Sequence, residues 1–337
     1  MKVLIATGIY PPQIGGPAQY AKELYGALAR AGQEVEVATY GRERSFGTGL
    51  RHLLFFLKIL APVRRADLII ALDTFSVALP ALLAAKLMRK KFVIRTGGDF
   101  LWESYLERTG EKVLLRHFYQ STANRWNKKE ESIYKITSFI LKHTDLVIFS
   151  TNWQREIWQP VYNLPAAKTA IIENYYGPKE RSGEPEGKVY LGAARPLVLK
   201  NLDVLAMIFF DLKRHDGTLQ LDLETASYEE HVQKMKSCYA VIVTSLSEIS
   251  PNMILDAVRL GKPFICTKET GLYERLRGYG LFVDPENERD IAEKIMTLAD
   301  PGEYSRWRAR VHQFNFIHTW DEIAAEFIKL AQQLWES

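Results

Sequence analysis

Short apolar runs alternate with helix-length segments along the whole chain, and this alternation restricts the fold more than any other feature. Continuous apolar runs of this length are typical of parallel strands covered on both faces. In the first half, the strand-like runs are residues 2–7, 34–40, 67–72, 91–96 and 145–150. The expected helices there are residues 18–31, 50–60, 75–88 and a long stretch around 113–143.

The second half repeats the same order of elements. This alternation predicts an α/β fold with a doubly wound, Rossmann-like parallel sheet in each half. The strand-like runs are residues 188–194, 218–224, 239–245, 263–267 and 280–285. The expected helices are residues 202–214, 228–237, 251–260 and 288–298.

The break between the halves falls in residues 168–188, which lose periodicity and gain Gly, Pro and charge, as in a linker. We therefore expect an N-terminal domain over residues 1–174 and a C-terminal domain over 175–318. The amphipathic last helix, residues 319–337, is expected to pack back on the first domain. Ligands of such sheets bind beyond the carboxyl ends of the strands, so a cleft between two facing domains is the expected active site.

The composition is that of a soluble globular protein, with 337 residues, 47% of them hydrophobic and 25% charged, enough for two cores. Two cysteines, Cys238 and Cys266, argue against a disulfide framework and fit a reducing, cytoplasmic compartment. The N-terminal apolar run is interpreted as a strand rather than a signal peptide. No apolar run reaches the roughly 20 residues needed to cross a bilayer.

Two acids follow the strand-like run 239–245, in the stretch SLSEISPNMILDAVRLGKP. Glu248 lies in the expected loop at the carboxyl end of the strand, where it can accept hydrogen bonds from hydroxyl groups. Asp256 lies one turn into the next helix and can accept two hydrogen bonds from a vicinal diol. The helix start between them offers free N–H groups and a partial positive charge, which suit a phosphate. The residues at this helix start are Ser250, Pro251, Asn252 and Met253.

Two cations, Arg195 and Lys200, follow the first strand of the second half around a turn. They can face one pyrophosphate, Arg as a bidentate fork and Lys as a point charge. A site in which acids bind hydroxyl groups, and backbone amides and cations bind phosphates, suits a nucleoside diphosphate sugar. Taken singly, each residue fits a helix cap or a surface charge as well. Their occurrence on successive strand ends favours the functional interpretation.

These motifs resemble those of family 4 of the retaining glycosyltransferases, which have the GT-B fold of two facing Rossmann-like domains. The family carries an acid-x7-acid motif, matched here by Glu248 and Asp256, and an Arg-x4-Lys pair, matched by Arg195 and Lys200. The segment GGPAQYAKELYGALARAGQEVEVAT is similar to the family's Gly-Gly loop, first helix and second strand. GLFVDPENERDIAEKIMTL and the closing helix with Trp320 also fit.

The resemblance implies a role for each matching residue. Glu248 would contact the sugar hydroxyls, and Asp256, shorter than the usual Glu, would hold the ribose diol. Arg195 and Lys200 would stabilise the diphosphate leaving group. The loop of Gly15 and Gly16 would approach the diphosphate and the acceptor, because a backbone without a side chain admits a ligand closely. A plain flexible turn explains these two glycines equally well.

The sequence departs from the family pattern at two places. RTGGDFLWE follows the fourth strand where the family often has a histidine, and here Asp99 is the nearest polar candidate for the site. Asp99 could instead cap the next helix. In addition, one strand–helix unit of the usual C-terminal domain is missing. That region commonly frames the nucleobase, so the loop at Glu224 and Thr225 becomes the replacement candidate.

Other enzyme classes are disfavoured because their motifs are absent. No G-x-G-x-x-G follows a strand, and G-x-x-x-x-G-K-[ST], H-E-x-x-H and G-x-S-x-G do not occur. There is also no Asp-x-Asp pair to hold a divalent metal against a diphosphate. Arg and Lys can neutralise the diphosphate instead, so we expect no metal and no cofactor apart from the donor substrate.

The charge is unevenly distributed along the chain. Residues 1–160 hold 23 Lys and Arg against 14 Asp and Glu, whereas the remaining residues hold 21 against 26. The helix GLRHLLFFLKILAPVRR, residues 49–65, combines apolar residues with four cations. It fits either a core helix with a basic solvent side or an interfacial helix on an anionic membrane. In the second case the enzyme would be peripheral on the inner membrane face; no nucleic-acid module is recognisable.

The sequence therefore predicts a metal-independent enzyme that moves a sugar, of the hexosyl type, from a UDP- or GDP-sugar to an acceptor hydroxyl. Retention of configuration and a role in glycan or glycolipid biosynthesis, with a glycan or lipid-linked acceptor, are implied by the family. Two alternatives stay open: a nucleotide-sugar epimerase on the same fold, and a non-catalytic nucleotide-sugar-binding protein. The identity of the sugar, base, acceptor and oligomer does not follow from the sequence.

Overall fold

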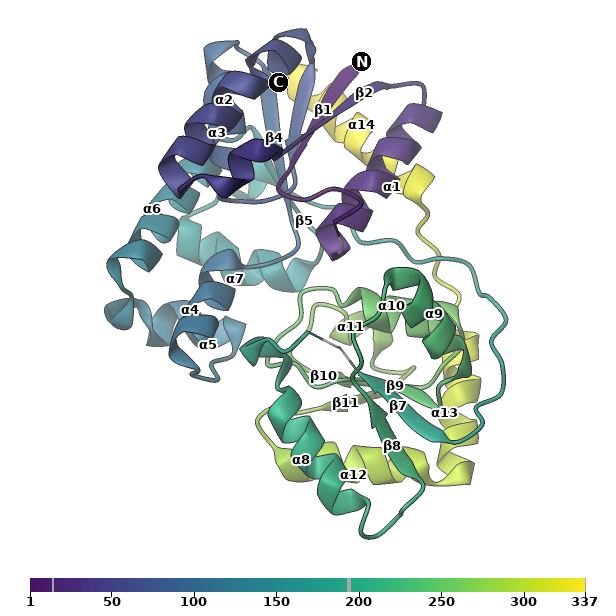
Figure 1. The fold of residues 1–337 in the computed structure, drawn as a ribbon. Coiled ribbons are helices and arrows are strands. Elements are labelled where there is room, and N and C mark those ends of the chain that lie inside the picture. Colours follow the sequence, from purple (N-terminus) through teal and green to yellow (C-terminus); the bar gives the residue numbers. More distant parts are fainter. Residues whose placement is uncertain (14, 193–194, 337) are drawn as a thin grey trace. The chain divides into compact units, whose positions relative to one another are not determined.

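The computed structural model describes residues 1–13, 15–192 and 195–336. The chain divides into two compact units (Figure 1). Unit 1 comprises Met1–Leu101, Asn124–Asn174 and His318–Ser337, and unit 2 comprises Trp102–Ala123 and Tyr175–Ile317. One division falls directly after Asn174. Trp102–Ala123 groups with unit 2, although it comes from the first half of the sequence.

Unit 1 is built on a six-stranded sheet in the order β2-β1-β3-β4-β5-β6, and all neighbouring strands are parallel. The central strands are buried at every residue except Lys91, as expected for a sheet covered on both faces. The strands are β1 (Lys2–Thr7), β2 (Glu34–Thr39), β3 (Leu68–Ala71), β4 (Lys91–Thr96), β5 (Leu146–Phe149) and β6 (Thr169–Ile171).

The helices of unit 1 include the last helix of the chain. It packs against the first helix: Tyr20 and Trp320 form an edge-to-face ring pair with centroids 5.1 Å apart, and Arg30 pairs with Asp321 at 2.7 Å. The α-helices are α1 (Gly16–Arg30), α2 (Thr48–Arg65), α3 (Ala78–Leu87), α6 (Lys128–His143), α7 (Asn152–Tyr162) and α14 (Trp320–Glu336). The 3-10 helices of the unit are η1 (Arg42–Ser45) and η3 (Ala166–Lys168), and η2 (Ala123–Arg125) straddles its edge.

Unit 2 is built on a five-stranded parallel sheet in the order β11-β10-β9-β7-β8 (Figure 1). The five strands match the sequence expectation of one strand–helix unit between the first helix of this half and the strand before the acid motif. The strands are β7 (Lys188–Gly192), β8 (Leu219–Asp222), β9 (Ala240–Val243), β10 (Phe264–Thr267) and β11 (Leu281–Val283).

The core of unit 2 includes two apolar clusters, and successive residues of β9 alternate between them. Val241 and Val243 of β9 belong to one cluster, whereas Ala240 and Ile242 belong to the other. This alternation is the two-residue period of a strand with both faces covered. The helices are α5 (Leu115–Ser121), α8 (Leu202–Leu212), α9 (Tyr228–Ser237), α10 (Asn252–Arg259), α11 (Tyr273–Leu276), α12 (Glu288–Ala299) and α13 (Pro301–Gln313), with η4 (Val198–Lys200) before α8. Helix α4 (Phe100–Thr109) spans the division after Leu101.

The structure corrects the sequence analysis at several elements. The expected long helix around residues 113–143 is two helices, α5 and α6, because Asn127 begins α6 with a capping box. The Glu130 amide donates to Asn127 Oδ1 at 2.9 Å, and the Asn127 amide donates to Glu130 Oε2 at 2.9 Å. Strand β6 lies inside the stretch interpreted as a linker; it has three residues, too few for a periodic signal. Helices α4, α7, α11 and α13 were not among the expected helices.

Candidate active site

Lys200 and Glu248 form the centre of the predicted site in unit 2. Lys200 ends η4, after β7, and Glu248 lies in the loop between β9 and α10. Because β7 and β9 are neighbours in the parallel sheet, their carboxyl ends meet. Lys200 Nζ lies 2.5 Å from Glu248 Oε1, and Ser245 Oγ donates to the same oxygen at 2.7 Å. The Lys200 and Glu248 side chains are 15% and 14% exposed, so this ion pair is largely shielded from water.

Hydrogen bonds fix the backbone of Glu248 as well as its side chain. Its amide donates to the Glu269 carbonyl at 2.8 Å, and its own carbonyl accepts from the Gly271 amide at 3.2 Å. Both side-chain contacts use Oε1. Within the described part of the chain, Oε2 of Glu248 has no hydrogen-bond partner. A fixed carboxylate oxygen of this kind can accept a hydrogen bond from a ligand hydroxyl.

Arg195, the other predicted cation, is exposed and stands five residues before Lys200. Among the residues that the structure describes, its guanidinium forms no hydrogen bond or ion pair. Its backbone carbonyl accepts from the Leu197 amide at 2.8 Å, which fixes the turn. The structure therefore brings Lys200 to Glu248, whereas within the described residues Arg195 has no hydrogen bond or ion pair with Glu248.

The start of α10 lies a few residues after Glu248. Pro251 occupies the N-cap position, and among the residues that the structure describes no side chain forms a capping hydrogen bond there. Pro251 is buried, Asn252 is exposed, and Ser250 and Met253 are half-buried. The helix thus begins at Asn252, one residue later than expected, and its first backbone N–H groups lie at this end.

Asp256 lies on α10 and forms an ion pair with Arg259, one turn further along. Arg259 Nη2 lies 2.9 Å from Asp256 Oδ1, and the Tyr228 hydroxyl donates to the same oxygen at 3.3 Å. Burial raises the pKa of the Asp256 carboxyl, and the Arg259 guanidinium opposes this shift. Burial also raises the pKa of Tyr228 to about 12, with Asp256 adding to the effect. Oδ2 of Asp256 has no hydrogen-bond partner among the described residues.

Three supporting residues were not found from the sequence: Ser245, Arg259 and Tyr228. Arg259 follows Asp256 by three residues on one helix, a spacing that predicts contact. Ser245 precedes Glu248 by three residues in a loop, where spacing alone predicts no contact. Tyr228 comes from a different helix, α9, and the sequence carries no signal that joins it to Asp256.

The loop of Glu224 and Thr225, predicted to face the nucleobase, follows β8. Both residues are exposed. The Glu224 amide donates to Asp222 Oδ1 at 2.9 Å, and Lys234 Nζ lies 2.8 Å from Glu224 Oε2. The loop therefore has a defined backbone turn and an ion pair with α9.

Gly15 and Gly16 lie in unit 1, at the start of α1. Gly15 has a φ of 152°, a conformation that side chains disfavour, and a Cβ atom there would lie 3.1 Å from Ile9 Cδ1. Gly16 is the first helical residue and Pro17 follows it. Gly15 is thus required by its backbone conformation, whatever it binds.

Asp99, also in unit 1, directly precedes α4. It is 1% exposed, and its Oδ2 accepts a hydrogen bond from Trp158 Nε1 at 2.9 Å. Trp158 is on α7 and is itself buried. The structure thus gives Asp99 a partner within the core of unit 1.

No group of three or more His, Cys, Asp or Glu side chains in the described ranges could hold a metal ion. Among the same residues, no helix combines the length and hydropathy needed to span a membrane.

Residues 14–176 match the model of Glycosyltransferase Family 4. These residues therefore form a family 4 glycosyltransferase domain. The match covers Gly15, Gly16 and Asp99, whereas Lys200, Glu248 and Asp256 lie outside it. No curated protein matches the sequence of this glycosyltransferase.

Solved structures show that the glycosyltransferase has the GT-B architecture of two Rossmann-like domains. Sucrose-phosphate synthase from Thermosynechococcus elongatus aligns with a TM-score of 0.72 and 15% identity, over 99% of each chain. The catalytic domain of starch synthase IV from Arabidopsis thaliana, bound to ADP and acarbose, aligns with a TM-score of 0.69 and 11% identity, over 99% of each chain. HepE of Anabaena, in complex with UDP-glucose, aligns with a TM-score of 0.66 and 14% identity, over 100% of this chain and 98% of that one. At these low sequence identities, the similarity shows only that the fold is shared.

Proposed function

We propose that this glycosyltransferase moves a hexosyl group from a nucleoside diphosphate sugar to an acceptor hydroxyl, with retention of configuration. The observation that carries the proposal is the pair of Lys200 and Glu248 at the carboxyl ends of β7 and β9, beside the start of α10. A cation, a carboxylate with one oxygen available and a helix N-terminus suit a sugar diphosphate. UDP-glucose in HepE and ADP in starch synthase IV support a nucleotide-linked donor.

Each residue has a distinct part in the proposed reaction. Lys200 and Arg195 stabilise the negative charge that develops on the departing diphosphate. Oε2 of Glu248 accepts a hydrogen bond from a sugar hydroxyl, and Oδ2 of Asp256 accepts one from the ribose. Because Lys200 and Arg195 supply the positive charge, this mechanism requires no divalent metal.

Retention follows in the proposal from attack on the face that the diphosphate leaves. The departing diphosphate takes the acceptor proton, so the reaction needs no separate base. Asp99 has a buried partner in Trp158 and is assigned a supporting role in unit 1. The loop of Glu224 and Thr225 is proposed to contact the nucleobase of a UDP- or GDP-sugar.

The direct test separates transfer from its two alternatives. Purified protein is incubated with UDP-, GDP- and ADP-sugars, with and without acceptor glycans or lipid-linked sugars, and the products are identified by mass spectrometry and NMR. If the protein transfers the sugar with retention, product should form only when an acceptor is present. The product should have the same anomeric configuration as the donor. Conversion of the donor alone would indicate an epimerase, and donor binding without turnover would indicate a binding protein.

A second part of the proposal concerns a lipid-linked acceptor in glycolipid or glycan biosynthesis. Helix α2 exposes a stripe of leucines one to two turns apart: Leu50, Leu53 and Leu57 are 49%, 55% and 55% exposed. The opposite side of α2 is apolar as well, since Phe55, Ile59 and Val63 are fully buried. A helix that is apolar on its buried side and carries exposed leucines on the other is suited to contact an apolar phase.

Cations accompany the exposed leucines. Arg64 and Arg65 end α2, and Lys86 and Leu87 are exposed at the end of α3. Basic residues beside an apolar stripe are attracted to anionic lipid headgroups. We therefore infer that this face rests on an anionic membrane, which would make the enzyme peripheral on the cytoplasmic side.

Vesicle flotation tests the membrane contact. Wild-type protein should float with vesicles containing anionic phosphatidylglycerol and not with pure phosphatidylcholine. A Leu53→Glu, Leu57→Glu variant should lose flotation. A Met207→Glu, Phe210→Glu variant is the matched control, because these exposed apolar residues lie on α8 of unit 2. Equal flotation of both variants would disprove the assignment to α2.

A further inference from the structure

The segment Trp102–Ala123 lies against the carboxyl edge of the sheet in unit 2, although it precedes that sheet by more than sixty residues. Its polar groups contact the loops that follow β7 and β9. The Val198 amide donates to Glu107 Oε1 at 2.7 Å, and the Leu115 amide donates to Ser247 Oγ at 3.0 Å. The segment therefore packs on the loops that carry Lys200 and Glu248.

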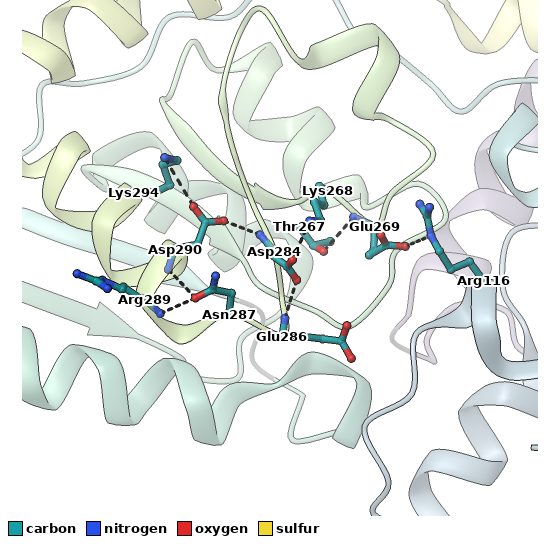
Figure 2. A network of polar contacts seen from close by, with 10 residues as sticks. All are labelled: Arg116, Thr267, Lys268, Glu269, Asp284, Glu286, Asn287, Arg289, Asp290 and Lys294. Carbon is teal, nitrogen blue, oxygen red and sulfur yellow. Dashed lines mark hydrogen bonds and ion pairs between the residues drawn. The ribbon is translucent and has the colours of Figure 1, made fainter. Parts of the chain in front are cut away.

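Arg116, the next residue of this segment, pairs with Glu269 in the loop after β10 (Figure 2). Arg116 Nε lies 2.5 Å from Glu269 Oε2. The backbone carbonyl of Glu269 accepts from the Glu248 amide at 2.8 Å. One backbone hydrogen bond thus joins the residue that holds Arg116 to the residue that holds Lys200, at the same edge of the sheet.

The two members of this second pair differ in exposure. The Glu269 side chain is 5% exposed, whereas the Arg116 side chain is 43% exposed. The contact uses only Nε of Arg116, and within the described part of the chain its Nη1 and Nη2 have no hydrogen-bond partner. A buried carboxylate holds the guanidinium at one side and leaves its outer N–H groups to solvent, in the arrangement that binds two phosphate oxygens at once.

Another cation at this edge is engaged differently. Lys268 Nζ lies 2.7 Å from Asp284 Oδ2, so that lysine joins the ends of β10 and β11 (Figure 2). Lys268 and Asp284 are 48% and 32% exposed, and neither is buried as Glu269 is. Arg116 therefore differs from Lys268 in having a buried acid as its partner.

We propose that Arg116, oriented by Glu269, is a third cation of the nucleotide-sugar site and binds phosphate oxygens of the donor diphosphate through Nη1 and Nη2. The inference rests on the proposed function, because it needs a diphosphate beside Lys200 and Glu248. Arg116 is then a binding residue and Glu269 a positioning residue that acts through it. The donor site would include a residue from the first half of the sequence, outside the motifs that define the site.

The test measures nucleotide binding by full-length protein, using calorimetry with UDP, GDP and ADP, and with the matching monophosphates. For the nucleotide that wild type binds, Arg116→Ala should weaken diphosphate binding about 10- to 100-fold, by loss of a charged bidentate contact. The monophosphate should be affected less. Arg116→Lys should fall between wild type and Arg116→Ala. Arg277→Ala is the matched control, because Arg277 pairs with Glu274 at 3.5 Å on the exposed surface nearby.

Glu269→Gln tests the positioning role. It should weaken diphosphate binding less than Arg116→Ala does, and the double variant should bind no worse than Arg116→Ala alone, since residues that act as one unit are not additive. Additive losses would overturn the role of Glu269. Thermal unfolding of every variant separates a loss of binding from a loss of folded protein.

The outcomes distinguish this inference from the proposed function. Wild type that binds none of the three diphosphates would contradict the proposed function itself. Wild type that binds a diphosphate, together with a folded Arg116→Ala of equal affinity, would overturn only the role of Arg116. If Arg116→Ala fails to fold, the Arg116→Lys variant is tested in its place. Wild-type affinity of Arg116→Lys for both the diphosphate and the monophosphate would then contradict the bidentate contact.

Discussion

Lys200 and Glu248 are 48 residues apart in the chain, and Lys200 Nζ lies 2.5 Å from Glu248 Oε1. The sequence motifs assign the lysine to the diphosphate and the acid to the sugar. In the structure each is the partner of the other, so a sugar diphosphate would enter between charges that already hold one another in place. Such preorganised charges need little rearrangement during the reaction.

The first prediction concerns this ion pair. Lys200→Ala should lower kcat about 100- to 1,000-fold, as expected for loss of one preorganised transition-state contact. It should also destabilise the fold by about 2 kcal/mol, because Glu248 stays largely buried without its partner. Steady-state transfer assays and urea unfolding measure the two effects. Lys268→Ala is the control, since it breaks a more exposed pair at the same sheet edge and should change both quantities little.

The second prediction concerns Asp256 and pH. Burial raises its pKa above the ordinary value of 3.8, so the carboxyl takes up a proton at a higher pH than an exposed aspartate. Nucleotide affinity should therefore fall as the pH is lowered from 7 toward the raised pKa. Asp256→Asn should bind more weakly at pH 7 and lose this pH dependence, as calorimetry across the pH range will show.

The same pKa shift affects stability in the opposite direction. A raised pKa in the folded state means that the native protein favours the protonated carboxyl, so this contribution to stability is full below pH 3.8 and is lost as the pH rises through the raised value. The melting temperature of Asp256→Asn relative to wild type should accordingly increase with pH over that window. A constant difference would show that Asp256 titrates as an ordinary aspartate.

The third prediction concerns Gly15. Its φ of 152° disfavours any side chain, and a Cβ atom would press on Ile9. Gly15→Ala should cost at least about 1 kcal/mol of unfolding free energy. Gly47→Ala is the control: Gly47 also precedes a helix, but its φ is −57° and a Cβ atom would meet nothing within 4 Å. Equal denaturation midpoints for the two variants would count against the backbone argument.

The fourth prediction concerns the two thiols. Cys238 is 3% exposed and Cys266 is fully buried, and burial raises the pKa of Cys238 to about 12 and that of Cys266 well above its ordinary value. Neither thiol should react with Ellman's reagent at pH 8 in the native protein, whereas both should react in guanidinium chloride. Rapid reaction of one thiol in native protein would contradict its burial.

The fifth prediction concerns Asp99. Asparagine keeps an oxygen to accept the Trp158 N–H, so Asp99→Asn should preserve most of the stability. With a supporting role, kcat should change less than threefold, a shift of about 0.7 kcal/mol in the barrier. A 100-fold loss of kcat in a folded Asp99→Asn protein would assign the carboxylate to catalysis instead.

Much of the fold could be predicted from the sequence, because buried parallel strands appear in it as continuous runs of apolar residues. Runs such as residues 2–7 and 91–96 are continuous in apolar residues, and the structure has strands at both places. The signal fails where an element is short. Strand β6 has three half-buried residues, and its pairing with β5 depends on a contact that no local pattern shows.

The candidate site divides in the same way. Glu248 and Asp256 could be selected from their spacing, because an acid after a strand and an acid one turn into a helix form a local pattern. The partners of these acids could not be selected in this way. Tyr228 reaches Asp256 from another helix, and Arg116 reaches Glu269 across 153 positions. Such contacts arise from the packing of whole elements, and a single sequence does not encode them in any short spacing.

The division of the chain has a consequence for its synthesis. The polypeptide passes between the two units after Leu101, Ala123, Asn174 and Ile317, so neither unit is one continuous stretch. Because α14 follows unit 2 in the sequence, unit 1 lacks this helix until all of unit 2 has been translated, and it cannot finish folding earlier. A recombination event at the linker alone would therefore transfer neither unit intact. Exchange of unit 2 with a relative would have to carry Trp102–Ala123 along with Tyr175–Ile317.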